Sequence, residues 1–259
     1  MDYVTCIERE APDFYPGSRP WSDAFGSTGS YPAADGLGAS IMRLRVPPSM
    51  LAGWLDEHWP LYPTWPFVRV GPRETPGLVP WLIGRGYTVA VREALLVLDL
   101  ALPLVTRKTG SASPVRRVRT LRALAEVNAL DHLCFPEDPV LLTDSLRREL
   151  LRLRGPQRRL YFIEGTADCA WAAAGVTVHD GWAYLWGGET HPEHRQQGLY
   201  RRLVTTRLRA ATRHRCRFVA VHANEETSAP ILLRLGFAKV EQQEVYRPPP
   251  EHLPSSLRA

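Results

Sequence analysis

The order of hydrophobic patterns in the second half of the chain is the feature that most limits its fold. Between residues 115 and 247, short strand-like apolar segments alternate with longer segments whose apolar residues recur at helical spacing. The predicted order is strand, helix, helix, three strands, helix, strand, helix, strand. This order predicts an α/β (α+β) fold in which helices pack on a mixed sheet.

Residues at the ends of these segments support the predicted elements. Thr143 is a predicted N-cap, because a threonine hydroxyl can accept a hydrogen bond from the first turn of a helix. The tripeptide His179-Asp180-Gly181 predicts a tight turn between two strands. Gly236 predicts the left-handed residue that follows a helix.

A polar stretch at residues 106–114, TRKTGSASP, separates two apolar patterns and predicts a linker. We therefore predict one domain at residues 1–105 and a second at residues 115–259, both of ordinary domain size. Residues 1–36 are rich in Gly, Pro, Ser and aromatic residues and are interpreted as an irregular arm.

A strand, a helix that ends in Gly-aromatic, and a long strand occur twice. Residues 67–99 run parallel to residues 218–248, and LIGRGY at 82–87 aligns with LLRLGF at 232–237. Chance similarity between two strand–helix–strand units is the alternative. If the repeat is real, the first domain is a truncated copy of the second, because too few residues precede it to hold the whole pattern.

The composition is that of a globular protein, with 44% hydrophobic and 23% charged residues. The longest apolar run, at 94–105, is too short to span a bilayer, and acidic residues stand near the N-terminus where a signal peptide would be basic. The scattered cysteines predict neither a disulfide framework nor a zinc site and fit a cytoplasmic location. The net charge of +5 is compatible with an anionic ligand or with nucleic acid.

The most informative segment for chemistry runs from Trp186 to Tyr200, where a strand leads through a glycine-containing loop into a helix. Backbone N–H groups of such a loop and the positive end of the helix point at one spot, which suits a pyrophosphate. Gly198 lets the backbone approach the phosphates closely. Gly187-Gly188, in mid-strand, predicts a β-bulge that separates this strand from its neighbour and opens a cleft.

At these residues the sequence resembles the GNAT acetyltransferase superfamily. Arg195-Gln-Gln-Gly198-Leu-Tyr200 is similar to that family's acetyl-CoA loop, and Pro192 stands where the longer form of the motif has it. Asn224, followed by a helix that ends in Gly236-Phe237, resembles the second family signature. The resemblance implies acetyl-CoA as cosubstrate and no metal. The implied acetyl-CoA-binding residues are Thr190, His191, Arg195, Gln196, Gln197, Gly198, Leu199, Tyr200, Arg201 and Asn224.

The resemblance covers residues 115–247 and implies the GNAT fold there. Together with the internal repeat, it implies two tandem GNAT-like domains, as in mycothiol synthase. Residues 41–60 fit the family's fourth strand and long helix, yet no glycine-rich loop joins them. The first domain is therefore predicted to be a degenerate half without an acetyl-CoA site.

Two residues depart from the family pattern. Tyr200 replaces Gly or Ala at the third loop position and either faces outward or crowds the phosphates. Leu232 stands where many members carry the tyrosine that protonates the departing CoA thiolate. Ser228 is one alternative acid, because branches that lack this tyrosine have a serine there, and a water molecule is the other.

The resemblance implies direct attack of an amine on the thioester in a ternary complex, with the bulged strand polarising the thioester carbonyl. Glu189, beside the two glycines, is the candidate base, and a partly solvated structural carboxylate is the alternative. His191 and His222 are reserve candidates. The spacing of His191 and His194 suggests a metal, but no third ligand is nearby in the sequence.

The acceptor that the resemblance implies is a primary amine, on a small molecule or at a peptide N-terminus. Trp171, Trp182 and Trp186 lie on predicted central strands and either shape an acceptor pocket or belong to the core. A non-catalytic acyl-CoA-binding or sensor module is the alternative function. Single-domain relatives bring two such domains together by forming a dimer, whereas a tandem chain holds two domains itself. A monomer is therefore favoured over a homodimer.

The predicted helix at residues 201–217 is strongly basic. A solvated helix face that also favours CoA phosphates is the preferred interpretation, because too few aromatic residues interleave for a single-strand nucleic-acid site. An RNA-associated protein that uses this helix is the weaker alternative, nucleic acid is not the favoured partner, and no membrane partner is predicted. The arginines are Arg201, Arg202, Arg207, Arg209, Arg213, Arg215 and Arg217.

Overall fold

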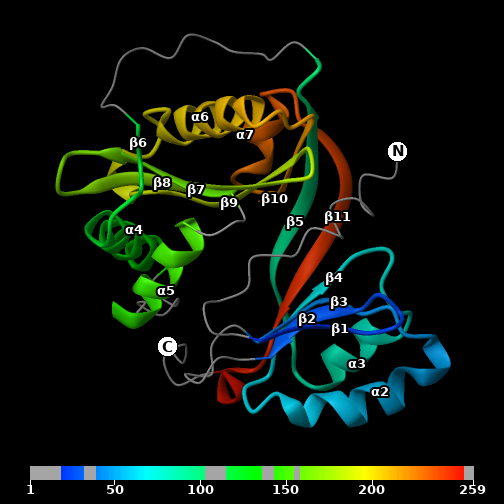
Figure 1. The fold of residues 1–259 in the computed structure, drawn as a ribbon. Coiled ribbons are helices and arrows are strands. Elements are labelled where there is room, and N and C mark those ends of the chain that lie inside the picture. Colours follow the sequence, from blue (N-terminus) through cyan, green and yellow to red (C-terminus); the bar gives the residue numbers. More distant parts are fainter. Residues whose placement is uncertain (1–18, 32–38, 103–114, 136–142, 155–157, 254–259) are drawn as a thin grey trace. The chain divides into compact units, whose positions relative to one another are not determined.

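The computed structural model describes residues 19–31, 39–102, 115–135, 143–154 and 158–253, and they form two compact units (Figure 1). The first unit comprises the described residues of Leu95–Ala223 and Thr227–Val240, and the second those of Ala11–Ala94, Asn224–Glu226 and Glu241–Ala259. The strands β5 (Thr88–Asp99) and β11 (Ala238–Arg247) contribute residues to both units. The predicted linker at 106–114 lies outside the described residues, and the domain boundary placed there stays a prediction.

The first unit follows the order of strands and helices predicted from the sequence. Its elements are β6 (Arg116–Arg117), α4 (Leu121–Cys134), α5 (Thr143–Arg154), β7 (Arg158–Gly165), β8 (Ala170–His179), β9 (Trp182–Thr190), α6 (Leu199–Arg213), β10 (Phe218–Asn224) and α7 (Ala229–Leu233), with the start of β11. The strands are hydrogen-bonded in the order β5-β10-β9-β8-β7-β6. Strand β10 is parallel to β9, whereas β9, β8, β7 and β6 are successively antiparallel, so the sheet is mixed as predicted.

Helices cover both faces of this sheet. Helix α6 lies on one face, and α4 and α5 lie on the other (Figure 1). On strand β7, Tyr161 and Ile163 pack into the core with α4 and α5. Because side chains alternate along a strand, Leu160, Phe162 and Glu164 face the α6 side. Within the described part of the chain, no helix is both long and apolar enough to cross a membrane.

The predicted turn signals occupy the expected conformations. Asp180 and Gly181, between β8 and β9, have φ values of 41° and 81°. Positive φ at both central residues is typical of a two-residue hairpin turn whose backbone twist matches the twist of the flanking strands. Gly236 has a φ of 96° after α7, and the Phe237 N–H donates back to the Leu232 carbonyl at 3.2 Å. Helix α5 begins at Thr143, so the predicted N-cap is instead the first helical residue, and the Thr143 side chain lies outside the described residues.

In the second unit the strands are hydrogen-bonded in the order β1-β2-β3-β4-β11-β5. Its other elements are β1 (Arg19–Ser22), β2 (Thr28–Tyr31), β3 (Ser40–Arg43), α2 (Leu51–His58), β4 (Phe67–Val70) and α3 (Leu78–Gly84). The expectation of an irregular arm is wrong for residues 19–31, which form an antiparallel hairpin. Asp23 closes that hairpin, because its carboxylate accepts hydrogen bonds from the N–H groups of Phe25 and Ser27 at 2.9 and 2.8 Å.

The strand–helix–strand repeat is also present in the structure. β4, α3 and β5 reproduce the order of β10, α7 and β11. Gly86, the counterpart of Gly236, has a φ of 81°, and the Tyr87 N–H donates to the Leu82 carbonyl at 3.1 Å as Phe237 does to Leu232. Tyr87 and Phe237 are both buried. The two segments therefore share the backbone conformation as well as the sequence of the helix end.

Gly175 of β8 lies directly against the indole ring of Trp186 on β9. A Cβ at this position would lie 2.4 Å from ring atoms, so Gly175→Ala forces the ring out of its place. We expect this substitution to lower the free energy of unfolding by about 1–3 kcal/mol in a denaturant titration, as is typical of overpacking. Gly84→Ala is the control, because no heavy atom lies within 4 Å of that Cβ and the site is helical. Equal stability of the two variants would contradict the steric argument.

Candidate active site

Strand β9 contains the β-bulge predicted at its two glycines. Ala173 of β8 pairs with Glu189, and Gly175 pairs with Trp186, so Gly187 and Gly188 together oppose a single residue. Gly187 has a φ of 53°, in the left-handed region that favours glycine. The bulge interrupts the ladder between β8 and β9 at these two glycines.

Arg207 of α6 lies beneath this bulge. Its side chain is 1% exposed, and one guanidinium nitrogen, Nη1, donates to the carbonyls of Gly175 and Trp186 at 3.2 and 3.4 Å. Burial lowers the pKa of Arg207 from its usual value. The expectation of a solvated arginine face is therefore wrong for this residue. Arg207 bonds to one carbonyl on each of the two strands, at the residue pair that precedes the bulge on β9.

A short loop connects β9 to α6 in the way the sequence predicts. After the 3₁₀ turn at Pro192–His194, Gln196 and Gly198 adopt φ values of 63° and 76°, and Gly198 is the N-cap of α6. The N–H groups of the first turn of a helix have no partner inside the helix. Together with the positive end of the 15-residue helix, they form a site suited to phosphate oxygens.

The loop is fixed to the sheet by an ion pair that the sequence did not reveal. Glu164, near the end of β7, is fully buried, and its two carboxylate oxygens accept hydrogen bonds from Nε of Arg202 at 2.8 and 3.1 Å. Nη1 of Arg202 also donates to the Gln197 carbonyl at 3.0 Å. Arg195 holds the other end of the loop by donating from Nε to the Thr190 carbonyl at 3.3 Å.

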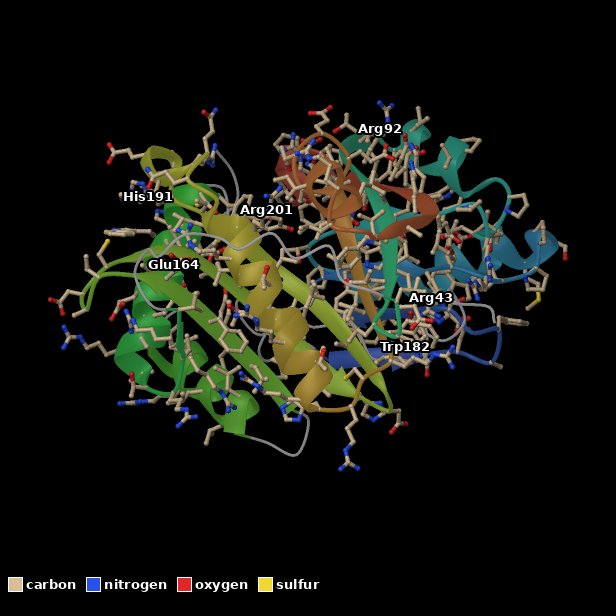
Figure 2. The ribbon with its side chains drawn as sticks, turned by 90° about the horizontal axis from the view of Figure 1, so that it is seen from above. Arg43, Arg92, Glu164, Trp182, His191 and Arg201 are labelled. Atoms are coloured by element: carbon tan, nitrogen blue, oxygen red, sulfur yellow. The ribbon has the colours of Figure 1, made fainter. Side chains whose placement is uncertain are left out.

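Tyr200 turns toward the bulge rather than away from it. A Cβ at Gly188 would lie 2.8 Å from the Tyr200 ring, so the absence of a side chain at Gly188 makes room for the tyrosine. The ring centroid is 5.9 Å from the Arg207 guanidinium. Leu199, the first residue of α6, is buried, and Arg201 is partly exposed near the start of the same helix (Figure 2).

Glu189 lies immediately after the bulge and is 4% exposed. Its carboxylate accepts a hydrogen bond from the Tyr161 hydroxyl at 3.4 Å. Burial, followed by the charge of Glu189, raises the pKa of Tyr161 well above its usual value, so this tyrosine stays a donor at neutral pH. Burial and then the same carboxylate also raise the pKa of Cys134, at the end of α4. Glu189 is thus a buried carboxylate with a fixed donor, not the partly solvated one considered from sequence.

His222 and Tyr184 form a second pair of titratable groups on the adjacent strands. Tyr184 of β9 and His222 of β10 are joined by a hydrogen bond of 2.6 Å between the phenol oxygen and Nδ1, and both side chains are partly exposed. The sequence singled out His222 but not Tyr184. Because β9 and β10 are parallel and their paired residues end at Leu185 and Val221, the pair lies at the point where the two strands separate.

The remaining sequence-predicted residues have local roles of their own. Nδ1 of His191 accepts from the Glu193 N–H at 3.2 Å and caps the 3₁₀ turn. Ser228 precedes α7 and is partly exposed, and Leu232 is fully buried. Asn224, in the second unit, accepts a hydrogen bond from the Glu226 N–H at 2.8 Å. Among the described residues, no cluster of three metal-ligating side chains is found.

The three tryptophans of the central strands have different surroundings. Trp186 packs against Tyr161 with ring centroids 4.9 Å apart, and its indole N–H donates to the Thr177 hydroxyl at 3.0 Å, which makes it a core residue. Trp171 stacks on His194 of the loop at 4.6 Å. Trp182 packs on Phe218 at 4.8 Å and is partly exposed.

Residues 124–237 match the model of the acetyltransferase (GNAT) family. The matched segment begins in α4 and ends just after α7, so it contains the bulge, the loop and the N-terminus of α6. A search of curated proteins found no significant match.

Solved structures with the same fold include three that cover most of the chain. A GCN5-related N-acetyltransferase from Kribbella flavida has 16% identity and a TM-score of 0.65, and the match covers 96% of this chain and 93% of that one. A GCN5-related N-acetyltransferase from Sphaerobacter thermophilus has 14% identity and a TM-score of 0.53, with 76% and 67% covered. A tandem GNAT protein from the clavulanic acid biosynthesis pathway has 16% identity and a TM-score of 0.53, with 76% and 68% covered. These likenesses confirm the predicted mixed α/β fold.

Proposed function

The chain carries a domain of the acetyltransferase (GNAT) family at residues 124–237, and from that premise we propose that it transfers the acetyl group of acetyl-CoA to a primary amine. The acceptor is a small molecule or a peptide N-terminus. One observation supports this most strongly. The bulge at Gly187-Gly188 and the loop at Arg195–Tyr200 are both tied to α6, because Arg207 donates to the Trp186 carbonyl beside the bulge and Arg202 donates to the Gln197 carbonyl of the loop.

The proposed reaction is a direct transfer in a ternary complex. The neutral amine attacks the thioester carbonyl carbon, a C–N bond forms, and the C–S bond breaks to release CoA thiolate. Backbone N–H groups beside the bulge stabilise the negative charge that develops on the carbonyl oxygen. The first turn of α6 and the loop N–H groups hold the pyrophosphate, so the acetyl group is delivered to the bulge.

Two protons have to move in this reaction, and we assign them to different groups. Glu189 receives the proton of the amine, through a water molecule because its carboxylate is 4% exposed. His222, paired with Tyr184, is the competing base. Ser228, which is partly exposed, donates its hydroxyl proton to the CoA thiolate and takes a proton from solvent water in the same step, since the position used by the family tyrosine is the buried Leu232.

We assign the acetyl-CoA site to residues 115–259 and regard residues 1–105 as a degenerate GNAT-like half. The repeated strand–helix–strand unit supports this assignment. β3 and α2 correspond to the strand and helix that flank the phosphate loop, but the segment between them contains Pro47 and Pro48 and no glycine. Proline lacks the N–H group that a phosphate would need.

The first test of the function is calorimetric titration with acetyl-CoA and with CoA, followed by measurement of thiol release with a panel of amines. We expect binding of both nucleotides and amine-dependent thiol release. Binding without release from any amine of the panel would replace the proposal by an acyl-CoA sensor, which the buried Leu232 in place of an acid would then explain. Failure to bind acetyl-CoA would overturn both functions.

Glu189→Gln tests the assignment of the base. We expect kcat/KM to fall by at least about a hundredfold, the usual loss for a general base, while the Kd for acetyl-CoA changes by less than about twofold. His222→Asn is the matched comparison. A large loss in His222→Asn with near-normal Glu189→Gln would transfer the assignment to the histidine.

Tyr161→Phe provides an independent readout of the same assignment. The substitution removes the hydroxyl that donates to Glu189 at 3.4 Å. A carboxylate that loses a donor becomes easier to protonate, so the acidic limb of the kcat/KM profile should move to higher pH. An unchanged pH profile would mean that Glu189 does not titrate in the reaction.

A further inference from the structure

A basic groove lies on the α6 face of the first unit, between α6 and the edge strands β6 and β7. Its volume is about 560 Å³, within the range of small-molecule sites. The charged and titratable side chains that line it are Arg117, Arg119, Arg202, Arg209, Arg213 and His214. No carboxylate is among the residues that line it.

The arginines line the groove because the helical periodicity of α6 and the alternation of side chains along β6 place them on the sides that face it. On α6, Arg202, Arg209 and Arg213 share one face, since positions seven and eleven residues apart return to the same side of a helix. Arg117 pairs with Phe162 across β6 and β7, on the face of the sheet that carries α6. Two rows of positive charge therefore border the same depression.

Three of the groove's arginines, Arg117, Arg209 and Arg213, have no carboxylate partner among the described residues. Glu164, which follows Leu160 and Phe162 in the row facing α6, is already engaged in the ion pair with Arg202. Within the described part of the chain, no ion pair involves Arg117, Arg209 or Arg213. The pKa of Arg117 is lowered by desolvation and then by the charge of Arg119, as expected where like charges are held together.

We propose that this groove binds a small ligand with several phosphate groups, at a site separate from the phosphate loop of α6. Guanidinium groups match phosphate oxygens in geometry as well as in charge. The floor of Leu160 and Phe162 is apolar, which leaves room for an organic part beside the phosphates. Phe162 is buried, so the groove offers no exposed aromatic ring for stacking of nucleic-acid bases, and a small ligand is favoured over a single strand.

The probe is inorganic tripolyphosphate, titrated calorimetrically into the full chain at fixed ionic strength. We expect Arg209→Gln/Arg213→Gln to weaken its binding at least tenfold. Arg215→Gln/Arg234→Gln is the matched control, because it removes the same charge from exposed arginines that do not line the groove, and it should weaken binding less than twofold. Absence of binding to the unaltered chain, or equal weakening by both double variants, would overturn the proposal.

Three further titrations distinguish the groove from other anion sites. Tripolyphosphate should still bind to the Gly198→Asp variant, and loss of binding there would place the anion on the acetyl-CoA loop instead. ATP carries the same triphosphate, so tighter binding of ATP would support a ligand with an organic part, and equal binding would support an inorganic one. A short oligouridylate that bound more tightly than either, with the same dependence on Arg209 and Arg213, would replace the proposal by a nucleic-acid surface.

Discussion

Gly198→Asp should abolish measurable binding of acetyl-CoA. Gly198 is the N-cap of α6 with a φ of 76°, and its backbone lies where the loop N–H groups converge. An aspartate there places a carboxylate against the pyrophosphate. Two like charges about 4 Å apart near a protein surface repel by about 4 kcal/mol, so the Kd should rise by at least about a hundredfold. Calorimetric titration with acetyl-CoA measures the change directly.

Two control variants separate the effect of the negative charge from the effect of adding a side chain at a left-handed glycine. Gly198→Asn has nearly the same shape without the charge and tolerates the left-handed conformation equally well, so it should retain much more of the affinity. Gly77→Asp introduces the same residue at another left-handed N-cap, that of α3, where φ is 94°. Acetyl-CoA affinity should be unchanged in Gly77→Asp, because we place no site there. Equal losses in Gly198→Asp and Gly198→Asn would show that backbone strain, rather than phosphate binding, is responsible.

The sequence predicts well those structural features that depend on the residues of one contiguous segment. The bulge follows from two glycines in mid-strand, and the left-handed N-cap of α6 follows from Gly198 between a strand and a helix. Both depend on backbone conformations that few residues other than glycine adopt. The helix end at Gly236 was predictable for the same reason, and the conformation at Gly86 repeats it.

The contacts that hold the site together join distant segments, and the sequence contained only partial signals for them. The sequence predicts a solvated helix face that includes Arg207. Arg207 nevertheless follows Leu199 and Leu203 at helical spacing, on the side of α6 that faces the sheet. That spacing predicts a buried position, although not its carbonyl partners. Glu164 gave no comparable signal, because the pattern of β7 assigns its face but cannot identify Arg202 as its partner.

Arg202→Met should strongly destabilise the first unit. The Glu164 carboxylate has zero solvent exposure and accepts both of its described side-chain hydrogen bonds from Arg202. Loss of the arginine therefore leaves this carboxylate buried without those donors. Removing one partner of a buried ion pair leaves an uncompensated charge, which typically costs about 3–5 kcal/mol. A denaturant titration should show this decrease in the free energy of unfolding. Affinity for acetyl-CoA should fall as well, because Arg202 also holds the Gln197 carbonyl at 3.0 Å.

A double variant decides whether the unpaired, buried carboxylate of Glu164 causes the loss of stability in Arg202→Met. Glu164→Gln/Arg202→Met removes the buried charge and should recover much of the lost stability, because a neutral amide is far less costly to bury. Arg122→Met is the control for the substitution itself. Its pair with Asp168 is 73% and 74% exposed, so less than about 1 kcal/mol should be lost. If the double variant is no more stable than Arg202→Met, the arginine contributes through its packing and its bond to the loop, and the ion pair adds little to the stability of this unit.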